Sequence, residues 1–406
     1  MAQDFTVDRN SPKWVLGADG YLKEYANDEA AIEFNADGSY KGVLVEPESV
    51  NEAKASEDLD NATYWTTVNT TIATDTETDP KGGTNSFLLS EDATTSIHTL
   101  VTASGHRPSI GSGETWTCSW FVKKGDGANA PDIVQIYLPA SLFGTAYANF
   151  DISVGGGTSG TVTDSSGGTA GIRYYGNGWY RISFTDTSSG AGNHISYLVF
   201  TNNNPTATAV PAYAGQTDAN VFVWGAQLEE SPIATSYIPT TTGAVTRVKD
   251  DIYLTSASSL IGQTEGTMFV EVDWQNVNSA ISQHILNVGD GANNRILLYN
   301  NYPNDELRMF INSNSTIQTN QGVSSTALTG IQKIAFAYKQ NDAELYRNGS
   351  SVSTDTTVDL SSLATPTDID LGQSYAAAFQ ANMHIRTVAI YKTRLSDAEC
   401  EALTTI

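Results

Sequence analysis

The sequence predicts an all-β protein with two domains. Three observations support this: the chain has 406 residues, it contains 34 Gly and 19 Tyr, and short stretches of alternating apolar and polar residues recur along it. Residues of these kinds, with abundant Thr and Ser, favour strands and turns over helices. A chain of this length is expected to form two domains. The boundary is predicted at residues 230–249, where an alternating stretch gives way to a linker rich in Pro and Thr.

Residues 1–45 are expected to form an N-terminal β arm made of small hairpins. Turn signals at Asp19-Gly20 and Asp37-Gly38 separate the strand-like segments 21–25 and 31–34. Small hairpins bury little core of their own, so we expect the arm to dock, either on its own domain or on a neighbouring protein. The arm shows no apolar heptads, which argues against a coiled coil.

Residues 46–229 contain a series of strand-like stretches whose number and size suggest a jelly-roll β-sandwich. In the stretch TWTCSWFVKK, residues 116, 118 and 120 fall on one face and residues 117, 119 and 121 on the other. In the final stretch, residues 221, 223 and 225 should share one face and residues 222, 224 and 226 the other. The stretches lie at residues 86–89, 97–103, 115–123, 133–138, 148–154, 171–175, 179–185, 195–201 and 220–227.

Residues 250–406 are expected to form the second β domain, closed by one short helix. The stretch KIAFAYKQNDAELYRNGS, residues 333–350, contains two alternating runs joined by a turn, and it ends in the hairpin signal Asn348-Gly349. Ser396 and Glu399 have the spacing of a capping box, in which each side chain satisfies a free backbone donor at a helix start. This is the only convincing helix signal in the chain.

Three motifs resemble virion proteins of tailed bacteriophages, a group of tail-fibre and structural proteins. The motifs are GVLVEPESVNEAKASEDLDNATYW (residues 42–65), GNGWYRISFT (residues 176–185) and WGAQLEE followed by ATSYIPT (residues 224–240). Val50 and Ala53 stand where this family usually has Thr and Leu. The resemblance covers most of residues 1–247. It implies a virion surface protein that contacts other tail or capsid proteins and forms a homo-oligomer, with a trimer as one arrangement.

Further motifs resemble two kinds of β-sandwich. The run TWTCSWFVKKGDG is similar to a strand of carbohydrate-binding-module-like sandwiches. GTMFVEVDW (residues 266–274), the hairpin at 333–350 and MHIRTVAIYKTRLSDAECEAL (residues 383–403) resemble the concanavalin A-like, laminin-G-type jelly roll. The resemblance implies two jelly-roll β-sandwich domains in tandem, after a short N-terminal β arm and before one short C-terminal helix. A lectin-type second domain further implies adhesion to host surface glycans.

Composition argues against several partners and locations. The 45 acidic and 21 basic residues give a formal charge of −24, which repels nucleic-acid phosphates and anionic membranes. The N-terminus lacks the apolar core of a signal peptide and no window is apolar enough to insert into a membrane, so we expect synthesis in the host cytoplasm and a place on the virion surface. Cys118 and Cys400 lie in different predicted domains and are expected to be unpaired, buried thiols.

The sequence shows no catalytic constellation. Glu271 and Asp273 lie on one face of a predicted strand and resemble the start of the Glu-x-Asp-x-(x)-Glu signature of laminarinase-type glycosidases. Retaining hydrolysis needs a further carboxyl as acid/base, but Gln275 or Asn276 occupies that position, and an amide cannot protonate a leaving oxygen. We therefore expect no enzyme activity, with a polysaccharide-degrading glycosidase as the weaker alternative.

Two loops of the second domain supply the candidate binding residues. The segment Tyr-Asn-Asn-Tyr-Pro-Asn-Asp at 299–305 presents aromatic rings among amides, and we name Tyr299, Asn301, Tyr302 and Asp305 as candidates for glycan contact. Packing or subunit contact is the alternative explanation for the same residues. We expect no cofactor and no metal.

The loop 289–294 leaves calcium open as an alternative to a plain turn. Its Asp290 and Asn293 carry side-chain oxygens of the kind that calcium prefers.

The leading hypothesis is therefore a non-enzymatic bacteriophage virion protein, as a tail-fibre, tail-tip or decoration protein that mediates adhesion to host glycans. A decoration protein without any ligand remains an alternative, as does the glycosidase. A bacterial extracellular adhesin is disfavoured because no signal peptide precedes the first domain.

Overall fold

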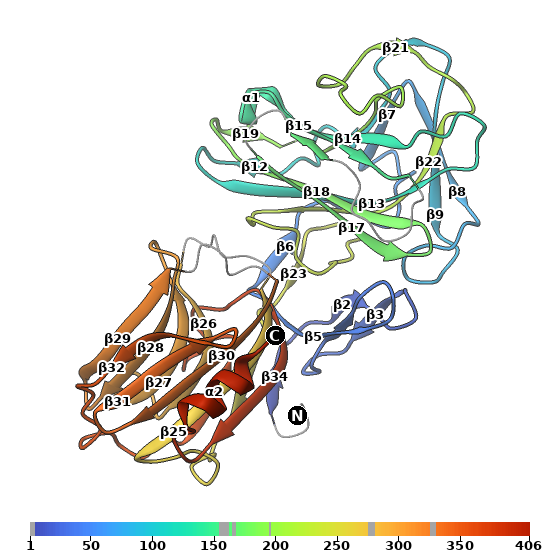
Figure 1. The fold of residues 1–406 in the computed structure, drawn as a ribbon. Coiled ribbons are helices and arrows are strands. Elements are labelled where there is room, and N and C mark those ends of the chain that lie inside the picture. Colours follow the sequence, from blue (N-terminus) through green and yellow to red (C-terminus); the bar gives the residue numbers. More distant parts are fainter. Residues whose placement is uncertain (1–4, 154–161, 165–167, 195, 275–280, 325–329) are drawn as a thin grey trace.

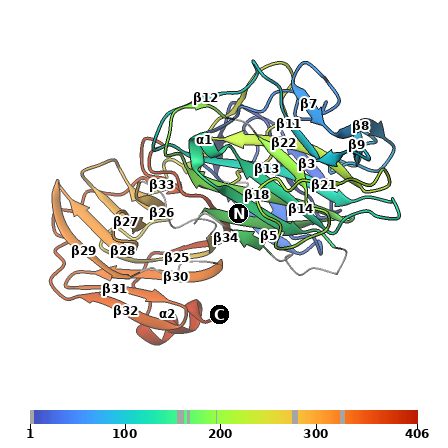
Figure 2. The same ribbon diagram turned by 90° about the horizontal axis from the view of Figure 1, so that it is seen from above.

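The computed structural model describes residues 5–153, 162–164, 168–194, 196–274, 281–324 and 330–406. It confirms the predicted all-β fold class, because the chain forms two jelly-roll β-sandwiches with a β arm and a short C-terminal helix. Figure 1 shows the first sandwich, coloured cyan to green, above the second, coloured orange to red. The view from above in Figure 2 shows the same two lobes side by side.

The first sandwich consists of two six-stranded antiparallel sheets. In spatial order, one of them, the β14 sheet, contains β16 (Val162–Asp164), β15 (Ala146–Asp151), β14 (Ile133–Leu138), β20 (Tyr197–Phe200), β11 (Thr99–Thr102) and β7 (Trp65–Val68). The other, the β13 sheet, contains β17 (Thr169–Gly176), β18 (Trp179–Thr187), β13 (Thr115–Lys124), β22 (Asn220–Glu229), β9 (Ser86–Glu91) and β8 (Thr70–Asp75).

All of the strands predicted for the first sandwich are present within a few residues of their expected bounds. Sequence reasoning missed β7, β8 and β16, two small ribbons and a four-residue helix. These elements are β10 (Thr95–Ser96) with β21 (Tyr213–Ala214), β12 (Ser109–Ile110) with β19 (Gly192–Asn193), and α1 (Ala140–Phe143).

The predicted faces of β13 are confirmed, whereas the faces of β22 change at Gly225. Trp116, Cys118 and Trp120 are buried in the core between the sheets, and Phe121 is buried on the opposite face of the β13 sheet. Gly225 has a φ of +60° and lies opposite a register shift in β13, so the alternation moves by one residue. Ala226 therefore returns to the same core as residues 221 and 223, and the expectation that it follows Trp224 is wrong.

The second sandwich consists of two seven-stranded antiparallel sheets. The β26 sheet contains, in spatial order, β1 (Thr6–Asp8), β24 (Asp251–Leu254), β33 (Asp368–Leu371), β26 (Gln283–Gly289), β27 (Arg295–Asn301), β28 (Glu306–Ser313) and β29 (Thr316–Ser324). The β25 sheet contains β32 (Ser350–Asp355), β31 (Asp342–Arg347), β30 (Gly330–Lys339), β25 (Glu265–Trp274), β34 (Met383–Tyr391), β5 (Tyr40–Val45) and β4 (Ile32–Phe34).

The N-terminal arm supplies edge strands to both sheets of the second sandwich. Strand β1 pairs with β24, and β5 pairs with β34 while β4 extends the sheet. The first sandwich is thus inserted between β5 and β24 of the second. The two connecting segments pair with each other as a ribbon of β6 (Ser49–Asn51) and β23 (Val245–Arg247). The predicted order was an arm, a first domain, a linker and a second domain along the chain. In the structure, strands of the arm are part of the second sandwich, and the linker pairs with the segment that follows the arm.

One hairpin of the arm covers the first sandwich instead. Strands β2 (Lys13–Leu16) and β3 (Leu22–Tyr25) pair around Gly20, whose φ is +80°, as the Asp19-Gly20 turn signal predicted. Leu16 and Leu22 pack with Phe121, Trp224 and other aromatic side chains on the outer face of the β13 sheet. The segment 230–249 lies on the same face, where the ring of Tyr237 is buried against these side chains. The arm therefore contacts both sandwiches.

A cluster of buried charges joins the arm to the two connecting segments. Asp250 accepts bonds from Arg9 Nη1 at 2.9 Å and from Lys13 Nζ at 2.6 Å. Lys13 also lies 3.0 Å from Glu46, which approaches Arg247 at 3.7 Å. All of these side chains are almost completely buried. We refer to Arg9, Lys13, Glu46, Arg247 and Asp250 as the junction cluster. Because buried charges require partners, their pairing fixes the position of each segment.

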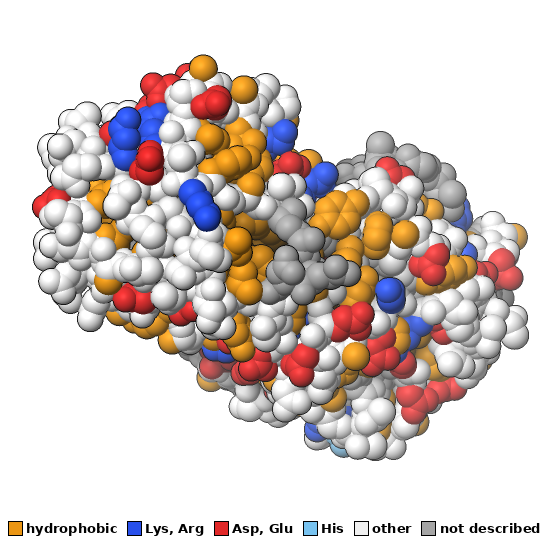
Figure 3. All heavy atoms as spheres, turned by 90° about the horizontal axis from the view of Figure 1, so that it is seen from below, with side chains coloured by type: hydrophobic (Ala, Val, Ile, Leu, Met, Phe, Trp, Pro, Cys, Tyr) orange, Lys and Arg blue, Asp and Glu red, His pale blue; other side chains and the backbone are white. Residues whose placement is uncertain are grey.

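The C-terminal helix α2 (Asp397–Thr404) begins at the predicted capping box, in which Ser396 and Glu399 exchange bonds. It packs Cys400 against the outer face of the β25 sheet. Cys118 and Cys400 are both free and buried, as expected. Within the described part of the chain, neither helix has the length and apolar character that a membrane crossing requires. Figure 3 shows acidic side chains spread over both lobes on the face seen from below.

Candidate ligand-binding site

A hollow with a volume of about 130 Å³ lies on the outer face of the β26 sheet, turned away from the core of the second sandwich. We call it the outer hollow. Its walls come from three neighbouring strands, β24, β33 and β26, and from the loop that follows β33. The lining residues are Tyr253, Thr255, Asn287, Gly289, Gly291, Asp368, Asp370, Tyr375 and Ala376.

Strand register brings the polar residues of the outer hollow together. Tyr253 lies opposite Asp370, and Asp370 lies opposite Asn287 on the next strand. The chain neighbours of these three polar residues point into the core of the second sandwich; Ile252, Ile369 and Val288 are examples. Side chains alternate between the faces of a strand, so the three polar residues form a row on the outer face.

The floor of the hollow is polar and buried. Asn287 Nδ2 donates to Asp370 Oδ2 at 2.7 Å, and the exposed fractions of the two residues are 1% and 7%. Asn287 Oδ1 is buried and has no hydrogen-bond partner among the described residues. Such an acceptor costs free energy unless a water or a ligand donates to it. The floor therefore presents one unsatisfied acceptor beside a carboxyl group.

The carboxyl group of Asp370 has a raised pKa. Burial raises its pKa to about 6, the hydrogen bond from Asn287 opposes the shift, and the neighbouring carboxylates of Asp251 and Asp368 add to it. At neutral pH the group is mostly ionised and accepts hydrogen bonds. Below about pH 6 it becomes protonated and can donate one.

The loop at residues 372–382 closes one side of the hollow in a strained conformation. Ala376, Ala377 and Phe379 have φ values of +67°, +48° and +58°, which non-glycine residues seldom adopt. The backbone bond from Ser374 N to Ala378 O, 2.8 Å long, holds the turn. This conformation places the ring of Tyr375, which is 37% exposed, at the rim of the hollow.

An aromatic surface continues from the hollow across the sheet. The guanidinium of Arg295 lies between Tyr375 and Phe310, at 5.5 and 5.1 Å from the ring centroids. Phe379 stacks on His284 with centroids 4.8 Å apart. Burial, followed by the charge of Arg295, lowers the pKa of His284 to about 3, so this ring is neutral at physiological pH. Flat rings next to a polar hollow offer surface for the apolar face of a ligand.

The glycan candidates chosen from the sequence lie within this aromatic surface or at the far end of the sheet. Tyr299 is buried in the aromatic surface against His284 and donates its hydroxyl to Asn320 at 2.9 Å. Asn301, Tyr302 and Asp305 lie at the turn between β27 and β28, at the opposite end of β26 from Gly289. Tyr302 is 48% exposed, but the structure does not bring these residues together around a hollow.

The calcium candidates lie beside the outer hollow, in the turn between β26 and β27. Asp290 and Asn293 are both exposed, and the backbone N of Asp290 donates to Asn294 O at 3.0 Å, which closes the turn. Across the described ranges, no group of three or more His, Cys, Asp or Glu side chains is arranged to hold a metal ion.

The carboxylates considered for hydrolysis lie on the other sheet. Glu271 forms an ion pair with Arg386 at 2.7 Å, and Asp273 follows on the same face of β25. Gln275 and Asn276 lie outside the described residues. The ion pair gives Glu271 a structural role on the central strand of the β25 sheet.

Sequence reasoning missed the residues of the outer hollow. Asp368 and Asp370 alternate with apolar residues, and Asn287 interrupts the apolar run HILNV, so each was visible as a polar residue on a buried strand. Their proximity depends on the pairing of β33 between β24 and β26, which no local pattern reveals.

Comparisons with known proteins concern the second sandwich first. A family model described as the concanavalin A-like lectin/glucanases superfamily matches residues 247–400. The matched range contains every residue that lines the outer hollow. None of the curated proteins matches the chain significantly.

Several solved structures show a limited similarity. The CBM40 of a Ruminococcus gnavus IT-sialidase, bound to α2,3-sialyllactose, is 18% identical over 36% of this chain and 86% of its own, with a TM-score of 0.32. Domain 4 of AbnA, an extracellular GH43 arabinanase from Geobacillus stearothermophilus in complex with arabinotriose, is 15% identical over 43% of this chain and 82% of its own, with a TM-score of 0.32. Chicken galectin 2 is 10% identical over 34% of this chain and 96% of its own, with a TM-score of 0.25. Similarities at this level support no conclusion about a ligand.

Proposed function

We propose that the second sandwich binds a glycan in the outer hollow, and that the protein is a non-enzymatic adhesion protein exposed on a virion. The supporting observation is the polar floor of Asn287 and Asp370 in a hollow that Tyr253 and Tyr375 also line. Sugar sites combine a few oriented hydrogen-bonding groups with an aromatic wall. The match of residues 247–400 to a lectin and glucanase superfamily agrees with this use of the fold.

In this binding mode a sugar hydroxyl donates to the unsatisfied Oδ1 of Asn287, and a second hydroxyl donates to the Asp370 carboxylate. The C–H face of the sugar ring rests on Tyr375 at the rim. The hollow of about 130 Å³ holds part of one sugar unit, so the rest of a longer chain would lie along Phe379 and His284.

A binding assay with matched variants tests this site. The protein is applied to a glycan array and to whole bacterial cells, with and without calcium, and the affinity for each bound glycan is then measured by calorimetry. Asp370→Asn and Tyr375→Ala are each expected to weaken binding about tenfold, or about 1.4 kcal/mol. Tyr302→Ala is the control, because Tyr302 is also an exposed tyrosine of the second sandwich but lies at the far end of the sheet. If Tyr302→Ala weakened binding and Tyr375→Ala did not, the site would instead be the loop 299–305.

The pH dependence of binding gives a second test. The pKa of Asp370 is raised to about 6, so its carboxylate loses its negative charge as the pH falls through 6, and the hydrogen bond that it accepts from the sugar hydroxyl weakens. Affinity should therefore fall between pH 7 and 5. Asp370→Asn should bind weakly at both pH values, without this dependence. An equal loss in both proteins would exclude Asp370 as the titrating group.

A place on the virion is supported by the three sequence motifs that resemble tailed-phage proteins. In this role the protein would contact other tail or capsid proteins and form a homo-oligomer, with a trimer as one arrangement. Light scattering on the purified protein measures the oligomeric state. Absence of binding to every glycan and cell surface would instead favour a decoration protein without a ligand.

A glycosidase is the second candidate, favoured by one observation. Asp370, with its raised pKa, shares a strand face with Asp368, and glycosidases use one protonated and one ionised carboxyl group. Release of reducing sugar from the bound glycan distinguishes the two functions. Release that Asp370→Asn abolishes would establish hydrolysis; binding without release would support adhesion.

A further inference from the structure

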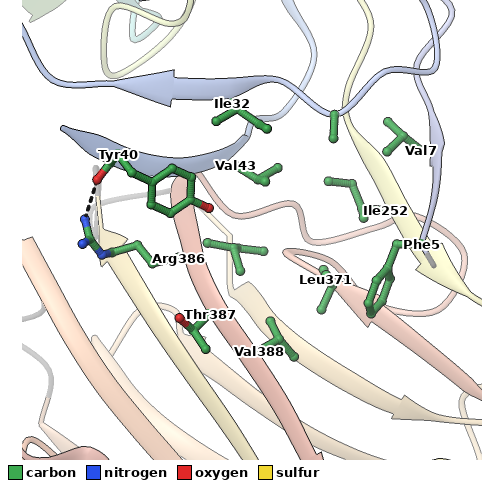
Figure 4. Close-up of a pocket in the computed structure, with 12 residues that line it drawn as sticks. Phe5, Val7, Ile32, Tyr40, Val43, Ile252, Leu371, Arg386, Thr387 and Val388 are labelled. Carbon is green, nitrogen blue, oxygen red and sulfur yellow. Dashed lines mark hydrogen bonds between the residues drawn. The ribbon is translucent and has the colours of Figure 1, made fainter. Parts of the chain in front are cut away.

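A second and larger cavity lies inside the second sandwich, between its two sheets at the side closed by the arm. Its volume is about 400 Å³. Figure 4 shows side chains from both sheets pointing into this space, with Ile32 and Val43 on one side and Ile252 and Leu371 on the other. We call it the inter-sheet pocket. On the face seen from below, hydrophobic side chains also gather in the hollow between the two lobes (Figure 3).

The way in which the chain completes the sandwich explains the pocket. The arm strands β1 and β4 are each only three residues long, and β5 pairs with β34 only from Val43 to Val45. Short edge strands bring few side chains to the space between the sheets. The core farther inside is filled by Val45, Met268 and other side chains that are fully buried. The unfilled volume is therefore confined to the side that the arm closes.

The wall of the pocket is almost entirely aliphatic. It is formed by Val7, Ile32, Val43, Ile252, Leu371 and Ile385, with the ring of Phe5 at one side. An apolar cavity of this kind does not hold water well, because water needs two to four polar partners. An empty cavity in turn loses the dispersion contacts that its lining atoms would otherwise make. An apolar ligand would restore those contacts.

The polar groups gather at one end of the pocket. Arg386 Nη1 donates to the backbone O of Tyr40 at 3.2 Å, as the dashed line in Figure 4 shows, and Arg386 Nε donates to Glu271 at 2.7 Å. The side chain of Thr387 lies beside Arg386, and the ring of Tyr40 is 41% exposed above them. The pairing with Glu271 neutralises the charge of Arg386. This end therefore suits a hydrogen-bonding head group.

We propose that the inter-sheet pocket binds a free single-chain amphiphile, with its alkyl or acyl chain between the sheets and its polar head beside Tyr40, Arg386 and Thr387. The volume lies within the range of about 300–1,000 Å³ that small-molecule sites occupy. Because the arm supplies part of the wall, binding also holds the arm on the sandwich. This site is separate from the outer hollow, which lies on the opposite face of the β26 sheet.

Binding of a fluorescent anilinonaphthalene sulfonate to the full chain tests the pocket, with dodecanoic acid and 1-dodecanol as competitors. One saturable site per chain is expected, displaced by both competitors. Val43→Phe fills the pocket from its wall, so it should weaken probe binding at least tenfold while the thermal midpoint stays the same or rises. Val352→Phe is the control, since Val352 is also half-buried against the second core but lies on β32, at the far edge of the sheet.

A second variant covers the case in which Val43→Phe fails to fold. Thr387→Trp narrows the mouth without entering the core, and it too should weaken probe binding at least tenfold. Absence of a saturable site, or equal binding by the native protein and a folded pocket variant, would overturn the proposal. So would probe binding that weakens as protein concentration rises, which would mean that a second copy fills the pocket. Cosedimentation with phosphatidylcholine vesicles, lost on Val43→Phe, would replace the free amphiphile with a membrane lipid.

Discussion

The two sandwiches are built from the chain in different ways. The first is a single continuous stretch. Among the residues that the structure describes, the core between its two sheets contains none from the arm, and it is rich in tryptophan, including Trp65, Trp116 and Trp120. The second is assembled from two stretches that the first sandwich separates, and its core is mostly aliphatic. Figure 1 shows the blue strand β5 completing the red and orange sandwich. The second sandwich therefore depends on contacts between distant parts of the chain, whereas the first carries its own core.

The difference has a functional consequence. Both hollows that we assign to ligands belong to the second sandwich, and each lies where distant segments meet. The outer hollow needs β24, β33 and β26 in register, and the inter-sheet pocket needs the arm. The first sandwich is formed by one continuous stretch and its core is filled. The second sandwich is completed by the short strands of the arm, and the inter-sheet pocket remains beside them. In the sequence, the first sandwich lies between the arm and the strands of the second sandwich that the arm completes.

Deletion of residues 1–45 should give the largest effect and tests the comparison directly. The second sandwich loses β1, β4 and β5, and Glu46 and Asp250 lose the two cations that the arm supplies. We expect calorimetry of the deletion variant to lose the unfolding transition of the second sandwich. The transition of the first sandwich should remain, at a lower temperature, because Leu16 and Leu22 no longer cover the β13 sheet. A cooperative second transition at the original temperature would show that residues 250–406 fold without the arm.

Asp250→Ala should have the next largest effect. The change leaves Arg9 and Lys13 buried without their shared carboxylate, and breaking a buried ion pair costs about 3–5 kcal/mol. Chemical denaturation should show this loss in the second sandwich. Trp120→Ala is the matched change in the first sandwich, where removal of a fully buried ring costs about 3–5 kcal/mol.

If the sandwiches are as independent as their cores suggest, each of these changes should lower one transition and spare the other. Asp290→Ala, at an exposed carboxylate of the second sandwich, should change stability by less than about 0.5 kcal/mol. Equal destabilisation of both transitions by Asp250→Ala would mean that the junction cluster holds the whole molecule together.

Acid should weaken the second sandwich through the charges that hold its two stretches. Burial raises the pKa of Glu46, but Arg247 and Lys13 outweigh it and lower the pKa from 4.5 to about 2. A carboxyl group with a lowered folded pKa stabilises the fold above its unfolded pKa, and this contribution is lost as the pH falls from 4.5 to about 2. The shift of the Glu46 pKa corresponds to a decrease of about 3 kcal/mol in the free energy of unfolding.

His384 adds an effect at higher pH. Burial lowers its pKa below 6.5, although its contact with Glu33 opposes the shift. Below pH 6.5 the histidine is protonated in the unfolded chain but stays neutral in the folded chain. The free energy of unfolding should therefore begin to fall below pH 6.5. Unfolding titrations from pH 7 to 2 measure both effects, and His384→Gln should remove the decrease between pH 6.5 and 5. A decrease of the same size in His384→Gln would assign it to another group.

A smaller loss of stability is expected from a change in the C-terminal helix, which lies outside both cores. Ser396→Ala removes the capping box at the start of α2 and should cost about 1 kcal/mol, seen as a lower midpoint of the second sandwich. Ser350→Ala, at an exposed position on β32, is the control and should leave the midpoint unchanged. A loss as large as that of Asp250→Ala would place α2 within the cooperative core.

Local features of the fold were predictable because they depend on neighbours in sequence. The alternation in TWTCSWFVKK predicted the two faces of β13, and the Asn348-Gly349 signal marked the turn between β31 and β32, where both residues have positive φ. The Ser396 and Glu399 spacing predicted the helix start. The phase of β22 failed at Gly225 because a bulge against β13 shifted the alternation, and that shift requires the partner strand.

By itself the sequence determined the all-β class, the two sandwiches, the turns and the capped helix. These features depend on strand periodicity and turn chemistry, which involve residues only a few positions apart. Only the tertiary structure decided that the arm completes the second sandwich and that Lys13 and Asp250 meet in the buried junction cluster. It also decided that Asn287 and Asp370 share one hollow. These contacts join segments far apart in the chain, and their energies depend on burial and strand register that exist only once the sheets have formed.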